Sequence, residues 1–192
     1  MTIYDITQKI KRVFYRVTYS QIIKRGFARC GKQVSVPEYC SFAGIKNIYV
    51  GNDVSFGEHT QIMTTRAKVI IGDNVMFGPN VTIITGNHRT DIVGRTMISI
   101  TDSEKRNEDD EDIVFEGDNW IGANVTILKG VTIGMGSIVA AGSVVVKNVP
   151  ENTIIGGVPG KVIKKRMPDE LWAKHIQEIN GLIKYTIPKE HR

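Results

Sequence analysis

Residues 119–150 read NWIGANVTILKGVTIGMGSIVAAGSVVVKNVP, and in this stretch a large apolar residue returns at every sixth position. These anchors are Ile121, Ile127, Ile133, Val139 and Val145. The same phase, followed backwards, adds seven more anchors: Val50, Phe56, Ile62, Ile71, Phe77, Ile83 and Phe115. In a chain that is 41% apolar, twelve such residues at twelve positions would arise by chance on the order of once in 10⁵. The period therefore indicates a structural repeat.

Glycine directly follows six of these anchors, which suits a sharp corner because glycine has no Cβ. The six are Gly51, Gly57, Gly72, Gly78, Gly122 and Gly134. Small or β-branched residues stand four positions after the anchors, as at Val125 and Ser143, and favour short strands. Six residues per side with a turn at each vertex predict an all-β fold, a three-sided parallel β-helix. The spacing leaves the hand open, and the general rule for parallel crossovers favours a right-handed coil.

The repeats resemble those of the hexapeptide-repeat acyltransferases. The resemblance rests on IGDNVMFGPNVTIITGNH (71–88), on residues 119–150, and on IIGGVPGKVIKKR (154–166), and the pattern covers about two thirds of the chain. The galactoside, maltose and nodulation acetyltransferases, the xenobiotic acetyltransferases, and those of capsule and exopolysaccharide clusters are similar. The resemblance implies a left-handed coil, a homotrimer, and acetyl-CoA bound between subunits as a co-substrate, with no tightly bound cofactor.

The length favours one domain of 192 residues with three segments. We expect a helical segment over residues 1–30, a β-helix over 31–163, and a C-terminal helix and tail over 164–192. The repeat is interrupted at about 86–114 by a long polar loop, which we expect to protrude from the coil. Loops of this length in a compact repeat domain are usually functional or disordered.

The first seventeen residues predict an amphipathic helix, because apolar residues recur at spacings of three and four with Lys and Arg between them. We favour an end cap packed on the first coil. The alternative is a helix that lies on a membrane surface as a peripheral contact. The charged residues exclude a signal peptide and a membrane span, so we expect a cytoplasmic protein, with the inner face of the membrane as the alternative site.

The chain carries a formal net charge of +5, with Lys and Arg concentrated within residues 9–32 and 161–174. Basic ends without an RNA-binding signature fit a phosphate-bearing small molecule or an anionic membrane better than a nucleic acid, so no nucleic-acid partner is expected. The two cysteines, Cys30 and Cys40, make no disulfide framework and are expected to be reduced.

His88, in the sequence TGNH, stands where the second block of repeats stops and the long loop begins. The resemblance implies that His88 is the catalytic base, facing the cofactor groove of the next subunit. An imidazole suits this role because it is neutral near pH 7 and can accept the proton of a hydroxyl. Asp91 is a candidate to orient the imidazole, with a backbone carbonyl as the alternative, and Asn87 is a weaker candidate.

Three further residues are candidates for acceptor binding. Glu58 and His59 stand where the galactoside-type relatives carry asparagines, and an exposed turn is the equally favoured alternative. Trp120 matches the family's tryptophan beside the pantetheine and acceptor region, although packing alone would also explain it.

The resemblance also implies a set of residues that bind acetyl-CoA. The amide of Ala123 corresponds to a donor to the thioester carbonyl, and the small residues Ala141, Gly142 and Ser143 correspond to the path of pantetheine. The basic end close to residues 154–166 corresponds to the site of the CoA adenine and phosphates. Its candidates are Lys147, Pro159, Lys161 and Lys164.

These observations predict an acetyl-CoA-dependent O-acetyltransferase that acts on a carbohydrate hydroxyl in polysaccharide or glycan biosynthesis. The enzyme alternatives are N-acetylation of an amino sugar or other small amine, and acetylation of a xenobiotic. The non-enzyme alternative is a structural β-helix scaffold. No metal is expected, because only His59 and His88 lie in the coil, while His175 and His191 belong to the tail.

Overall fold

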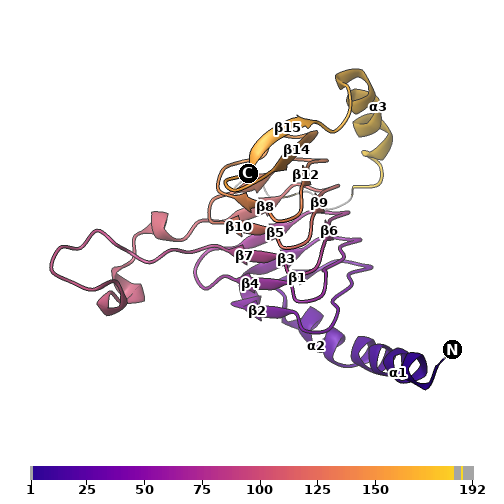
Figure 1. Ribbon diagram of the computed structural model, residues 1–192, viewed down its shortest axis with the longest axis horizontal. Helices are drawn as coiled ribbons and strands as arrows, with labels where there is room; N and C mark the ends of the chain where they lie inside the picture. Colours follow the sequence, from indigo (N-terminus) through magenta and orange to yellow (C-terminus); the bar gives the residue numbers. More distant parts are fainter. Residues whose placement is uncertain (1, 184–186, 188–192) are drawn as a thin grey trace.

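The computed structural model describes residues 2–183 and 187, and its centre is a coil whose sides are three β-sheets (Figure 1). Following the chain, we name these sheets the first, second and third faces. The first face holds β1 (Arg29–Cys30), β3 (Ile48–Val50), β5 (Val69–Ile71), β8 (Ile113–Phe115) and β11 (Thr132–Ile133). The second holds β6 (Met76–Phe77), β9 (Trp120–Ile121), β12 (Ile138–Val139), β14 (Thr153–Gly156) and β15 (Lys161–Lys165). The third holds β2 (Ser41–Ala43), β4 (Gln61–Met63), β7 (Thr82–Ile84), β10 (Thr126–Leu128) and β13 (Val144–Val145).

The strand register confirms the ladders that the six-residue period predicts. On the first face, Val50 pairs with Ile71, Ile71 with Phe115, and Phe115 with Ile133. All twelve predicted anchors are buried, with at most 5% of any of them exposed. Burial of one such side chain contributes roughly 1.5–3 kcal/mol, so these ladders are a major source of stability.

The corner between the second and third faces has the same backbone in each coil. His59, Asn124 and Gly142 occupy corresponding positions there, with φ of 59°, 58° and 73°. The stacking of coils also leaves no room for a side chain at Gly122, since a Cβ there would lie 2.5 Å from the nitrogen of Ala141 in the next coil. The corner therefore brings the backbones of successive coils close together.

The predicted loop is confirmed, and in Figure 1 it projects from the side of the coil. It occupies residues 85–112, between the end of β7 and the start of β8. Three short 3-10 helices lie within it: η2 (Met97–Ser99), η3 (Asp102–Glu104) and η4 (Asn107–Asp109). A fourth, η1 (Ile45–Asn47), belongs to the first coil.

The N-terminal segment forms two helices, α1 (Ile3–Val17) and α2 (Tyr19–Gly26), instead of one. The expected packing of the apolar side of α1 on the first coil is wrong, because α1 has no buried residue. The coil is capped instead by Ile23 of α2 and by Phe27, which pack on the core. No helix among residues 2–183 is long and apolar enough to cross a membrane.

The C-terminal helix, α3 (Asp169–Ile179), is fixed to the corner between the first and second faces. Trp172 is buried there against Gly136, where any side chain would collide with the indole ring. Asp118 accepts a hydrogen bond from Arg166 Nη1 at 2.6 Å, and its Oδ2 lies 3.1 Å from His175 Nε2. His175 therefore has a partner that belongs to this docking contact.

Candidate active site

His88 lies at the neck of the long loop, four residues beyond the end of β7. Two backbone hydrogen bonds join the outgoing and returning limbs of the neck: Asn87 N to Asp109 O at 2.8 Å, and Glu111 N to Thr85 O at 2.9 Å. The side chain of His88 is exposed and borders a hollow of about 360 Å³. Its imidazole makes no hydrogen bond to any described residue, so both ring nitrogens are available to a substrate.

The carboxylate of Asp91 is held by arginine and makes no hydrogen bond to His88. Arg89 donates to both of its oxygens at 3.0 Å, and Arg106 Nη1 lies 3.7 Å away. These hydrogen bonds lower the pKa of Asp91 to about 2, so the carboxylate stays charged throughout the neutral range. Asn87 lies on the same hollow as His88, with its side chain exposed.

Lys129 is a member of this site that the sequence reasoning missed. Its Nζ donates to the carbonyl oxygen of Glu108 and to Glu111 Oε2, each at 2.5 Å. Leu128 pairs with Ile84, so Lys129 follows at the level where the loop leaves the coil. The repeat contained this signal, because Lys129 stands two residues after its anchor, as Thr85 does in the preceding coil.

A buried carboxylate on the returning limb also fixes the neck of the loop. The side chain of Asp110 is only 4% exposed and pairs with Lys105 at 3.1 Å and with Arg66 at 3.3 Å. A side chain at Gly86 would displace this carboxylate, because a Cβ there would lie 2.0 Å from Asp110 Oδ1. The backbone next to His88 is thus held by contacts to the coil and within the loop.

Glu58 and His59 lie at the other edge of the third face. They precede β4, whereas His88 follows β7, so the structure does not bring them together with His88. The ring of His59 stacks on Tyr39 with centroids 5.0 Å apart, and its left-handed backbone is the one that Asn124 adopts at the corresponding corner. This geometry is that of a corner residue.

The predicted pantetheine residues gather at the corner between the second and third faces. The amides of Ala123 and Ala141, in successive coils, have no acceptor among the described residues. The hydroxyl of Ser143 is already used within the coil, because it donates to Ala140 O at 2.6 Å and accepts from Gly157 N at 3.2 Å. Gly142, which lies between Ala141 and Ser143 in the chain, is exposed.

The remaining candidates divide between two places. Trp120, 54% exposed on β9, lies on the second face just before the corner that holds Ala123. Pro159, Lys161 and Lys164 are exposed around β15, at the end of the same face.

Lys147 differs from these residues, because it follows β13 and lies on the edge that carries His88. The register places it one coil beyond Lys129, since Val145 pairs with Ile127. It is exposed. The structure therefore separates Lys147 from the other predicted CoA residues.

The candidate residues of one chain thus fall into two groups, two candidate half-sites, on opposite edges of the third face. The pantetheine corner precedes the strands of this face, and His88 follows them. Ala123 and Lys129 are six residues apart, which corresponds to at most about 20 Å of extended chain. The width of the third face therefore separates Ala123 from the imidazole of the same chain.

Among residues 2–183 and 187, no group of three or more His, Cys, Asp or Glu side chains is arranged to hold a metal ion. His191 lies outside the described residues. The described part of the site consists of an imidazole, free amides and surface cations.

Comparisons with known proteins identify the family of this repeat. Residues 112–147 match the family model described as "Bacterial transferase hexapeptide (six repeats)", and residues 68–86 match "Hexapeptide repeat of succinyl-transferase". A putative acetyltransferase of Saccharomyces cerevisiae is 39% identical over 151 residues, which cover 76% of this chain and 70% of the relative. The galactoside O-acetyltransferase of Lactococcus lactis is 32% identical over 148 residues, which cover 76% of this chain and 66% of the relative.

A solved structure extends the likeness to three dimensions. A hexapeptide-repeat acetyltransferase of Vibrio cholerae, complexed with acetyl-CoA, superposes with a TM-score of 0.71 at 30% sequence identity. The match covers 80% of this chain and 79% of that chain.

Proposed function

Because this chain belongs to the hexapeptide-repeat acetyltransferases, we propose that it transfers the acetyl group of acetyl-CoA to a carbohydrate hydroxyl, with His88 as the general base. The protein is an acyltransferase with acetyl-CoA as its co-substrate. The observation that carries the proposal is the exposed imidazole at the neck of the loop, with both ring nitrogens free among the described residues.

The chemistry follows from this imidazole. The acceptor hydroxyl attacks the thioester carbonyl while His88 takes its proton, so that a C–O bond forms. Collapse of the tetrahedral intermediate breaks the C–S bond, and the proton passes from His88 to the sulfur of the departing CoA. The free amide of Ala123 is the proposed donor to the intermediate's oxyanion, a type of contact whose loss typically costs about 10²–10³ in rate.

A homotrimer reconciles this chemistry with the distance between the two half-sites. We assign His88 and Lys147 to one wall of a groove, and Ala123, Ala141 and Lys161 of a neighbouring subunit to the other wall. This assignment gives Lys147 a role beside the CoA phosphates, although it lies away from Lys161 within its own chain. Cations on both walls favour a polyanionic ligand.

The carbohydrate acceptor is supported by two observations. The relative from Lactococcus lactis is named for a galactoside. The hollow beside His88 is lined by polar and charged side chains, which suit hydroxyl groups better than a flat aromatic molecule. Several loop charges already pair with one another, as Arg95 does with Glu104, so we expect Asn87 and Thr90 to supply the contacts to the acceptor.

A panel of sugars, sugar nucleotides, amino sugars and simple amines, tested with an assay for released CoA thiol, distinguishes the alternatives. O-acetylation of a sugar is the expected result. Transfer to amines alone would overturn the carbohydrate acceptor and establish the N-acetyltransferase alternative.

A further inference from the structure

The helix α1 is fixed to the coil by polar side chains on one of its sides. Lys11 Nζ lies 2.9 Å from Glu38 Oε2 and donates to the hydroxyl of Tyr39 at 2.9 Å. Tyr15 donates from its own hydroxyl to Pro37 O at 3.0 Å. All three contacts are made to a single corner of the first coil, so they set the orientation of the helix.

The apolar side chains of α1 point away from these contacts and are exposed. Their spacing of three and four residues places them on one stripe of the helix. They are Ile3 (82%), Ile6 (41%), Ile10 (64%), Val13 (49%), Phe14 (59%) and Val17 (62%), with exposed fractions in parentheses. On α2, Tyr19 and Ile22 are 59% and 65% exposed. An apolar surface that covers two consecutive helices is the kind that marks an interaction site.

Positive charge is concentrated in the same segment. The first 26 residues hold six Lys or Arg and one Asp, so they account for the whole formal net charge of +5. The remaining residues carry nineteen charges of each sign. The segment that exposes the apolar stripe therefore carries the whole excess of positive charge, while the charges of the remaining residues sum to zero.

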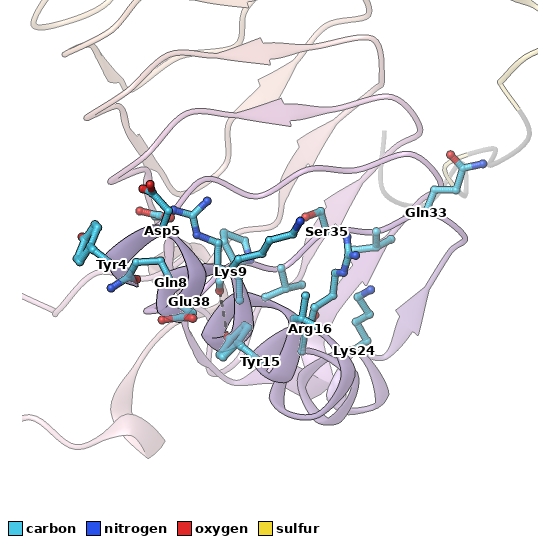
Figure 2. Close-up of a pocket in the computed structure, with 17 residues that line it drawn as sticks. Tyr4, Asp5, Gln8, Lys9, Tyr15, Arg16, Lys24, Gln33, Ser35 and Glu38 are labelled. Atoms are coloured by element: carbon cyan, nitrogen blue, oxygen red, sulfur yellow. Dashed lines mark hydrogen bonds between the residues drawn. The ribbon is translucent and has the colours of Figure 1, made fainter. Parts of the chain in front are cut away.

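Four of the basic side chains of α1 and α2 have no carboxylate partner among the described residues. Lys9, Arg12, Arg16 and Lys24 line a groove of about 880 Å³ between the helices and the first coil (Figure 2). None of the four forms an ion pair with a described residue. In Figure 2 the side chains of Lys9, Arg16 and Lys24 lie on the groove side of the helices. Lys11 borders the stripe on its other flank.

We propose that α1 and α2 lie on an anionic lipid bilayer, with the apolar stripe in the headgroup region and the flanking cations on lipid phosphates. A helix with one apolar face and a polar face rich in Lys and Arg binds in the plane of a membrane interface. A second copy of this chain fits less well, because the centres of subunit interfaces are depleted of charge, and a second copy would bring five more uncompensated positive charges. The surface at the N-terminal end of the coil thus faces the membrane.

Vesicle sedimentation of the full-length protein tests this proposal. We expect binding to mixed phosphatidylcholine–phosphatidylglycerol vesicles, weaker binding to pure phosphatidylcholine, and weakening by salt. Ile10→Glu/Phe14→Glu should lower the partition into mixed vesicles by about tenfold or more. Lys9→Gln/Arg16→Gln should lower it mainly at low salt.

The matched control is Val93→Glu/Ile98→Glu, which puts the same two charges on side chains that are 98% and 94% exposed in the long loop. This variant should bind vesicles like wild type with only a small loss from its added negative charge. Circular dichroism and light scattering of each variant check folding and assembly. The proposal is overturned if the wild type does not bind, if the loop variant loses as much binding as the helix variant, or if the helix variant changes the oligomeric state and keeps its vesicle binding.

Discussion

His88 and Lys129 come from consecutive coils and have different tasks in the proposed site. The imidazole of His88 is free and exposed, whereas the ammonium of Lys129 is used by two oxygens of the returning limb of the loop. The first is placed to touch substrate, and the second is a positioning residue. Their substitution should therefore lower kcat to different extents.

Replacement of His88 by alanine should lower kcat by about 10²–10⁴ and leave the Kd of acetyl-CoA nearly unchanged, because the loss falls on proton transfer. Steady-state kinetics and calorimetric titration measure the two quantities. His59→Ala is the matched control and should have a much smaller effect, since its ring stacks on Tyr39 at the opposite edge of the face. If His59→Ala were the more damaging variant, the assignment of His88 would be incorrect.

Lys129→Met should lower kcat about tenfold with little change in the Kd of acetyl-CoA, because the neck beside His88 loses two contacts. Lys129→Arg should restore part of the rate. The free energy of unfolding should change by less than about 1 kcal/mol, as is usual for exposed ion pairs. Lys46→Met, on η1, serves as the control. A purely structural role for Lys129 would show as lost stability with an unchanged kcat in the folded enzyme.

At the scale of elements, the six-residue period determines the inward-facing residue of each strand, and the sequence predicted these correctly. Bulky residues at that period can be buried together only if successive coils stack in register. The neck of the loop follows no period. The ion pair between Arg66 and Asp110 joins residues 44 positions apart, and no pattern in the sequence predicts such a pair. The sequence also could not predict whether the apolar side of α1 is buried or exposed, because its apolar pattern fits both arrangements equally well.

Ile121→Ala tests the ladders at this scale. Ile121 is fully buried between Phe77 and Val139, so the truncation should lower the free energy of unfolding by about 2–5 kcal/mol. Ile138→Ala, on the outward side of β12, should cost much less, since that side chain is only half-buried. Denaturant unfolding measures both variants. Equal losses would mean that the interior ladder is not the main source of stability.

At the scale of the whole molecule, the proposed chemistry requires a homotrimer, because His88 and the corner that holds Ala123 lie on opposite edges of one face. The resemblance of the sequence correctly gave the left-handed coil, against the general rule for parallel crossovers, and it also implied the trimer. What the sequence could not give was the division of the candidate residues between two edges of one face. That division depends on which strand precedes and which follows each corner. The structure places Lys147 on the same edge as His88, and it places His59 on the opposite edge.

The central claim is that each active site joins His88 of one subunit to the pantetheine corner of the next, and mixed trimers test it most directly. His88→Ala lacks the base, and Ala141→Trp blocks the corner, so each variant alone should be inactive. In trimers assembled from equal amounts of both, about a quarter of the sites combine an intact base with an intact corner, so about a quarter of the wild-type activity should return. Mixed trimers, verified by mass, that remain as inactive as the parent variants would contradict the shared site.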